Sequence, residues 1–148
     1  MGLFKSRSKG TYKLDALSQA EKSAVLQAFD LSMAAPVQAG LKGKALKNAR
    51  CVGSYTYQQL ADTKQHVQAN ALTEDDVKTV GFVLNAASFA VGELVKKKKE
   101  EIARMPKQIA GAQIAESAMW QSMQRNMKSA REKVEALLTN QDNSWKSF

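Results

Sequence analysis

One apolar stripe in the middle of the chain constrains the fold more than any other feature. Between Thr73 and Lys99, apolar residues recur at alternating spacings of three and four, which places them on one side of an α-helix. The stripe consists of Val77, Val80, Leu84, Ala87, Val91 and Leu94. Four consecutive lysines at positions 96–99 follow it. A helix with such a stripe must bury it against other helices, a partner protein or lipid.

The composition favours helices throughout the chain. Only two of the 148 residues are proline, and alanine, glutamine, lysine and methionine are prominent. No repeating pattern of strands and turns is present. The sequence therefore predicts an all-α protein of one domain, a helical bundle built on a long antiparallel hairpin of its two C-terminal helices.

Start and stop signals divide the chain into elements. A capping box from Ser18 to Glu21 opens a first helix, which Pro36 ends or kinks. Residues 44–70 are expected to form two helices, or one helix broken near Gly53. Thr73 caps a helix over 74–104, and after Pro106 a last amphipathic helix is expected over 107–139. We thus predict a basic arm at 1–14, a helical domain at 15–139 and a polar tail at 140–148.

The net charge of +8 is unevenly distributed, because residues 1–13 carry four bases and no acid. A second group of bases, Lys44, Lys47 and Arg50, lies at successive spacings of three. In a helix these three side chains would share one face. The predicted contacts with an anionic surface are Lys5, Arg7, Lys9, Lys44, Lys47 and Arg50. Their target could be the phosphates of nucleic acid, an anionic membrane surface or an acidic protein, and solvated basic faces remain an alternative.

Four aromatic residues are candidates for docking a partner protein. Phe82 and Phe89 are seven residues apart and lie together on a helix face away from the main stripe. Trp145 and Phe148 lie in the predicted polar tail, where they could fill a pocket on a partner or fold back on the bundle.

A methionine stripe on the last helix has two interpretations. Met119, Met123 and Met127 follow one another at spacings of four. We expect them to fill the core, and an adaptable docking groove is the alternative.

Two features raise the alternative of a membrane protein. Residues 79–95 approach the length of a membrane span, but Asn85, Ser88 and Glu93 interrupt them, and we expect a core helix of a soluble bundle instead. The N-terminus places Gly2 and Ser6 in the spacing of an N-myristoylation signal, followed by bases. An unmodified basic arm is the expected reading of this segment.

Catalytic groups are few. His66 is the only histidine, Asp62 lies one helical turn before it, and Cys51 is the only cysteine. A Cys51–His66 dyad is conceivable, but we expect a surface histidine and a buried cysteine. Asp62 and His66 supply two metal ligands where zinc takes three or four, so no catalytic, cofactor or metal site and no small-molecule substrate are predicted.

These observations favour a non-enzymatic structural or assembly component that binds other protein subunits as a homo- or hetero-oligomer. Analogy extends this to a virion- or envelope-associated particle. The alternatives are a nucleic-acid-binding protein and a peripheral membrane protein anchored by its N-terminus. The single cysteine excludes an internal disulfide, and no signal peptide is recognised. We therefore expect a cytoplasmic protein or part of a particle assembled in the cytoplasm, with a peripheral membrane location as the alternative.

Overall fold

The protein is mostly helical, with one small sheet. The computed structural model describes the backbone of residues 12–146 and the side chains of residues 12–139. Its elements are α2 (Gln19–Gln38), α3 (Gly43–Lys47), β1 (Arg50–Val52), β2 (Tyr55–Thr56), α4 (Tyr57–Ala69), α5 (Glu74–Ala103) and α6 (Gly111–Lys146). The predicted all-α class is thus correct in its helical character and misses a two-stranded antiparallel sheet.

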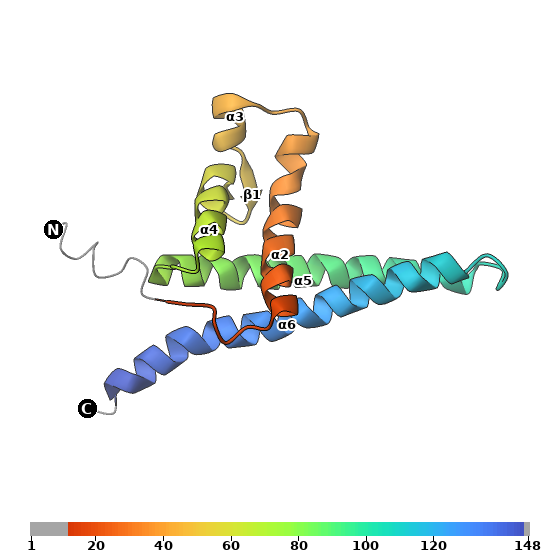
Figure 1. Ribbon diagram of the computed structural model, residues 1–148. Helices are drawn as coiled ribbons and strands as arrows, with labels where there is room; N and C mark the ends of the chain where they lie inside the picture. The colour runs from red at the N-terminus through yellow and green to blue at the C-terminus, as the bar shows by residue number, and fades with distance from the viewer. Residues whose placement is uncertain (1–11, 147–148) are drawn as a thin grey trace.

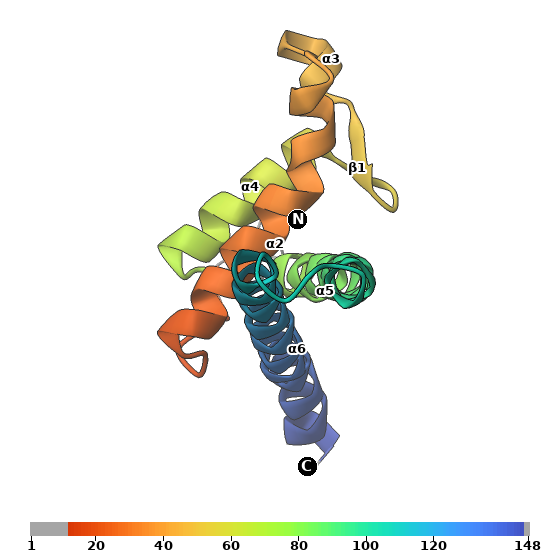
Figure 2. The same ribbon diagram turned by 90° about the vertical axis from the view of Figure 1, so that its right-hand side faces the viewer.

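The two long helices form the predicted hairpin. α5 and α6 run antiparallel and pack along one another, and α2 crosses both of them (Figure 1). α4 lies beside α2 and completes a second layer on one side of the hairpin, which is clearest when the hairpin is viewed along its length (Figure 2). The turn between α5 and α6 extends well beyond this second layer.

Capping residues fix where the helices begin. The predicted capping box at Ser18 and the predicted cap at Thr73 are both present, and Thr73 also forms a box, with Asp76. In each the hydroxyl accepts from the backbone N–H three residues on. Thr56 and Gln59 form a third box at the start of α4. The helix predicted over 74–104 ends at Ala103, within one residue of expectation. Pro36 lies in the last turn of α2, which ends two residues later.

The core lies between the hairpin and the second layer. Phe29 of α2, Leu60 of α4, Leu84 of α5 and Met127 of α6 are all fully buried there. Five members of the predicted stripe on α5 are buried, and Val83 and Val95 join them. The sixth member, Leu94, was expected in the core and is 42% exposed. The outer end of the hairpin, toward which α5 runs after this residue, extends beyond the second layer (Figure 1).

The methionine stripe shows the same change along α6. Met127 is buried in the core and Met123 packs partly against it, as expected. Met119, one turn further out, is exposed. The expectation of core filling is therefore correct only for the part of the stripe that other helices cover.

Residues 44–70 form two helices separated by a β-hairpin. The expectation of two helices is therefore correct, and the two strands between them were not predicted. Cys51, Val52, Tyr55 and Thr56 favour extended backbone and supply both strands. Gly53 adopts φ +55°, a left-handed conformation that glycine tolerates and most residues do not. This turn ends β1 and reverses the chain.

Both predicted ends of the helical domain need correction. Leu14 was placed in the arm but is buried in the core, and Tyr12 exchanges two backbone hydrogen bonds with Leu72, of 3.0 and 3.1 Å. α6 begins at Gly111 rather than 107 and continues to Lys146, through most of the predicted tail. Residues 140–146 contain neither glycine nor proline, so nothing in them stops a helix.

Candidate functional site

Part of the predicted binding set lies outside the described residues. This applies to Lys5, Arg7, Lys9, the acylation candidate Gly2 and Phe148. The backbone of Trp145 belongs to α6, and its side chain is outside the described set. The basic arm and the C-terminal aromatic anchors therefore stay predictions.

The second basic group does not share one helix face. Lys44 and Lys47 lie on the short helix α3, whereas Arg50 begins strand β1. The spacing argument assumed a continuous helix, and α3 ends at Lys47 because the chain turns into the β-hairpin. All three side chains are exposed and lie in the same projecting part of the molecule (Figure 1).

The two phenylalanines on α5 are both exposed to solvent, but they differ in how far other residues cover the ring. Phe82 is 45% exposed and its ring lies against Tyr55, with centroids 5.4 Å apart. The same ring fills the space beside Gly53, where an added Cβ would lie 2.8 Å from its tip. Phe89 is 71% exposed. Phe82 thus anchors the β-hairpin to α5, and Phe89 remains available to a partner.

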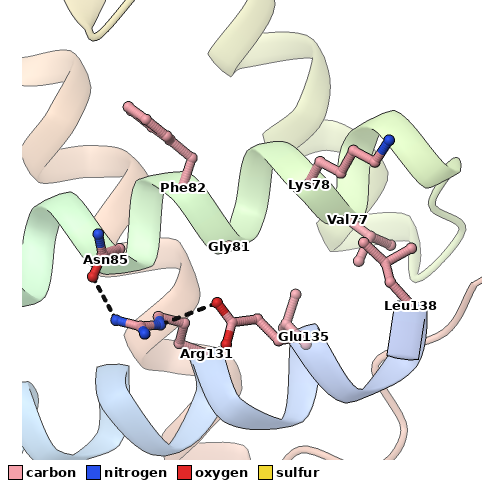
Figure 3. Close-up of a pocket in the computed structure, with 9 residues that line it drawn as sticks. Val77, Lys78, Gly81, Phe82, Asn85, Arg131, Glu135 and Leu138 are labelled. Carbon is pink, nitrogen blue, oxygen red and sulfur yellow. Dashed lines mark hydrogen bonds and ion pairs between the residues drawn. The ribbon is translucent and has the colours of Figure 1, made fainter. Parts of the chain in front are cut away.

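A groove lined by both polar and apolar side chains follows the side of the hairpin between α5 and α6. One section, of about 370 Å³, contains Asn85 and Glu135, which both bind the guanidinium of Arg131 (Figure 3). The next section, of about 450 Å³, shares Asn85 and Arg131 and is bordered by Phe89 and Lys128. Arg131 and Glu135 form an ion pair within the first section, and Lys78, which also borders it, pairs with Glu74 at 3.3 Å, so each charged side chain of this section already has a partner.

The outer part of the hairpin carries the most exposed apolar side chains. Of residues 96–116, all of which the structure describes, only Ala110 is buried. The large apolar side chains exposed in and near this segment are Phe89, Leu94, Ile109, Ile114 and Met119. Two helices alone cannot bury such side chains, so this region is the largest candidate surface for a partner protein.

His66 is paired with Asp76 and not with Asp62, which lies one helical turn before it. His66 Nδ1 lies 2.7 Å from Asp76 Oδ2, and Asp62 instead accepts a 2.8 Å hydrogen bond from Gln58. The same Asp76 oxygen accepts from the backbone N–H of Thr73, so His66 is tied to the cap of α5. This arrangement is structural: it joins the end of α4 to the start of α5.

Cys51 and His66 occupy different elements and have different partners. Burial raises the pKa of the Cys51 thiol, and its Sγ lies 3.8 Å from the carbonyl oxygen of Ala49. A raised pKa keeps the sulfur protonated and weakens it as a nucleophile. Among the described residues, no three His, Cys, Asp or Glu side chains gather as metal ligands would.

One buried charge was not found from the sequence. Glu21 accepts hydrogen bonds from the Ser18 backbone N–H, the Ser129 hydroxyl and Lys133 Nζ, the last at 2.7 Å. These donors lower the pKa of Glu21 to about 2, with Lys133 the largest cause. The Ser18 contact follows from the capping box, but the partners on α6 lie more than 100 residues away and leave no local signal.

α5 also passes the simplest test for a membrane span. It is long and apolar enough to cross a bilayer, with mean hydropathy 1.2 over its most apolar 18 residues. Within the protein, 44% of that window is buried, and the core helix of a soluble protein passes the same test.

Comparison with protein families, curated proteins and solved structures finds no match for this chain. No relative supplies a ligand, a partner or a reaction. The candidate binding surfaces are the outer hairpin, the groove beside it and the basic projection around α3.

Proposed function

We propose that this protein is a non-enzymatic assembly component whose outer hairpin packs against a second copy of the chain. The uncovered stripes on α5 and α6 carry this proposal. Leu94 follows buried Val83 and Ala87 at helical spacing, and Met119 precedes buried Met127 and Ala130 in the same way. Each stripe thus continues outward from the core onto the part of the hairpin that α2 does not cover.

A second copy that buried these stripes would extend the apolar core, because the stripes are continuous with it. Small residues accompany the large ones, because Ala90, Ala112 and Ala115 are exposed alongside Leu94 and Met119. Exposed alanines let a neighbouring helix come close, and methionine adapts its shape to the surface that meets it. A helix of a second hairpin fits such a surface through ordinary packing of ridges into grooves.

The outer hairpin carries a net positive charge, because residues 94–119 hold six bases and three acids. A second copy therefore meets like charge there, and burial of the apolar stripes has to outweigh the repulsion between the two copies. Closed two-fold dimers are the commonest form of self-association.

Light scattering after size-exclusion chromatography tests the proposal on nuclease-treated protein at low and high salt. We expect a discrete oligomer that persists at high salt, because apolar burial is not screened by ions. Leu94→Gln combined with Met119→Gln should convert it to a monomer with the same helix content. Lys97→Gln with Lys99→Gln is the matched control on the same helix pair and should leave the oligomer intact.

Two results would overturn the proposal. One is a monomer across the accessible concentration range. The other is an oligomer that survives the Leu94→Gln, Met119→Gln change unaltered, since the interface would then lie elsewhere. A monomer that retains nucleic acid and loses it in salt would favour the nucleic-acid alternative.

A further inference from the structure

The α3 tip, defined as residues 37–50, forms the far end of the second layer. It comprises the last turn of α2, all of α3 and the start of β1, and in both ribbon views it lies at the greatest height above the hairpin (Figures 1 and 2). Nearly every side chain from Val37 to Asn48 is exposed, and Leu46 is the exception. The tip therefore reaches a flat surface before any other part of this layer does.

No acid lies anywhere near the tip along the chain. Between Asp30 and Asp62 the sequence contains four bases and no aspartate or glutamate. The four bases are Lys42, Lys44, Lys47 and Arg50, and all are exposed. The two flanking acids are already engaged, because Asp30 binds Lys64 at 2.6 Å and Asp62 binds Gln58.

The side chains of the four tip cations have no partner among the described residues, as is also true of Lys96, Lys97 and Lys99 on α5 and of Arg125 and Lys128 on α6. Other described cations of the long helices are paired. Lys78, Lys98, Arg131 and Lys133 each form an ion pair with a glutamate. The structure shows no hydrogen bond or ion pair between a tip cation and any described residue. Four unpaired charges of one sign at a projecting end create a local positive field that attracts phosphate.

Two aliphatic side chains lie among these cations. Val37 is 52% exposed and Leu41 is 38% exposed, on either side of the turn at Gly40. Exposed apolar side chains flanked by bases are the composition of a surface that enters the boundary between headgroups and acyl chains. The tip contains no aromatic residue to stack on a base, and α3 is only five residues long, so it offers little to nucleic acid beyond charge.

We infer that the α3 tip is a docking site for the surface of an anionic lipid bilayer. Its cations contact lipid phosphates and carboxylates, while Leu41 and Val37 enter the interface. This inference is independent of the proposed self-association, which uses the outer hairpin. A dimer would carry two such tips and bind the bilayer more tightly through both.

Co-sedimentation of the full chain with phosphatidylcholine vesicles, with and without phosphatidylserine, tests the inference. We expect binding only when phosphatidylserine is present, weakening as salt rises. Lys44→Ala with Lys47→Ala should reduce the partition coefficient about 30-fold, or about fivefold for each cation removed. Lys97→Ala with Lys99→Ala removes the same charge from the hairpin and should change it less than about threefold.

The Leu41→Ser variant distinguishes binding to a bilayer from binding to a polyanion. It should weaken binding to phosphatidylserine vesicles and leave binding to a DNA duplex unchanged. All these positions are exposed, so thermal unfolding should match the parent protein and a loss of binding would not reflect misfolding.

Three outcomes would overturn the inference. The first is equal binding to vesicles with and without phosphatidylserine. The second is a vesicle interaction that the tip variants leave intact, particularly if Lys5→Gln, Arg7→Gln and Lys9→Gln together abolish it. The third is a DNA complex that the lysine changes weaken while Leu41→Ser alters no interaction, which would identify the tip as a nucleic-acid contact.

Discussion

Lys133 on α6 donates a 2.7 Å hydrogen bond to the carboxylate of Glu21 on α2, whose side chain is almost completely buried. Glu21 is also part of the capping box that begins α2. The same carboxylate therefore fixes where α2 starts and attaches that start to the last helix. This contact holds the second layer to the hairpin.

The Glu21 contact predicts that stability declines in acid. The pKa of Glu21 is lowered from an ordinary 4.5 to about 2, so the folded state binds this proton less readily than the unfolded chain does. Its contribution is complete above about pH 4.5 and is lost as the pH falls from there toward 2. Glu21→Gln should lower the melting temperature at pH 7 and reduce the difference between pH 7 and pH 3. An unchanged pH dependence in this variant would show that Glu21 is not the group responsible.

Gly81 and Gly92 provide a matched pair on α5. A Cβ at Gly81 meets nothing within 4 Å, so Gly81→Ala should stabilise the protein by about 0.5–1 kcal/mol through helix propensity alone. A Cβ at Gly92 would lie 2.5 Å from Nε2 of Gln124, which donates to the Ser88 carbonyl. Gly92→Ala should therefore gain less or destabilise, because that hydrogen bond is displaced. Urea titration measures both, and equal gains would mean that Gln124 is not held in place.

Phe82 and Phe89 form a second matched pair. Phe82 packs against Tyr55 and Gly53, so Phe82→Ala should cost about 1–2 kcal/mol and loosen the β-hairpin. Phe89 is largely exposed, and Phe89→Ala should stay within about 0.5 kcal/mol. Chemical denaturation followed by circular dichroism gives both values. A larger loss at Phe89 would contradict its exposed position.

The buried stripe on α5 predicts a severe effect at Val91. Its side chain is fully buried, so Val91→Asp places an unpaired charge in the core and should cost at least about 3 kcal/mol. Lys97→Glu, on the exposed lysine run of the same helix, is the control and should barely change the melting temperature. An unchanged melting temperature for Val91→Asp would mean that the stripe does not form the core.

The sequence predicted those parts of the fold that depend on local interactions. The caps at Ser18 and Thr73 and the extent of α5 are correct, because capping and helical periodicity act within one or two turns. The short strands around Gly53 were not predicted. A sheet of five residues depends on contacts with the rest of the protein, such as that of Tyr55 with the Phe82 ring, and these contacts leave no local signal in the sequence.

The wrong predictions have a common physical cause. Helical spacing shows which residues share a helix face, but it does not show whether another element buries that face. Leu94 and Met119 continue buried stripes at helical spacing, yet both side chains are exposed. Asp62 and His66 have the spacing of a pair, but Asp76, from the next helix, takes the histidine. The sequence indicated which residue types could form the candidate site. It did not indicate where the surfaces lie, because their positions depend on how the hairpin and the second layer pack together.

The attachment of α2 to α6 also bears on how the chain is made. Glu21 and Lys133 are separated by 112 positions, so this bond forms only after the segment that becomes α6 has left the ribosome. Until then the apolar sides of α2 and α5 lack their shared cover, and a nascent chain is open to aggregation or to capture by a chaperone. The start of α2 is therefore attached late, although α2 is among the first segments to be made.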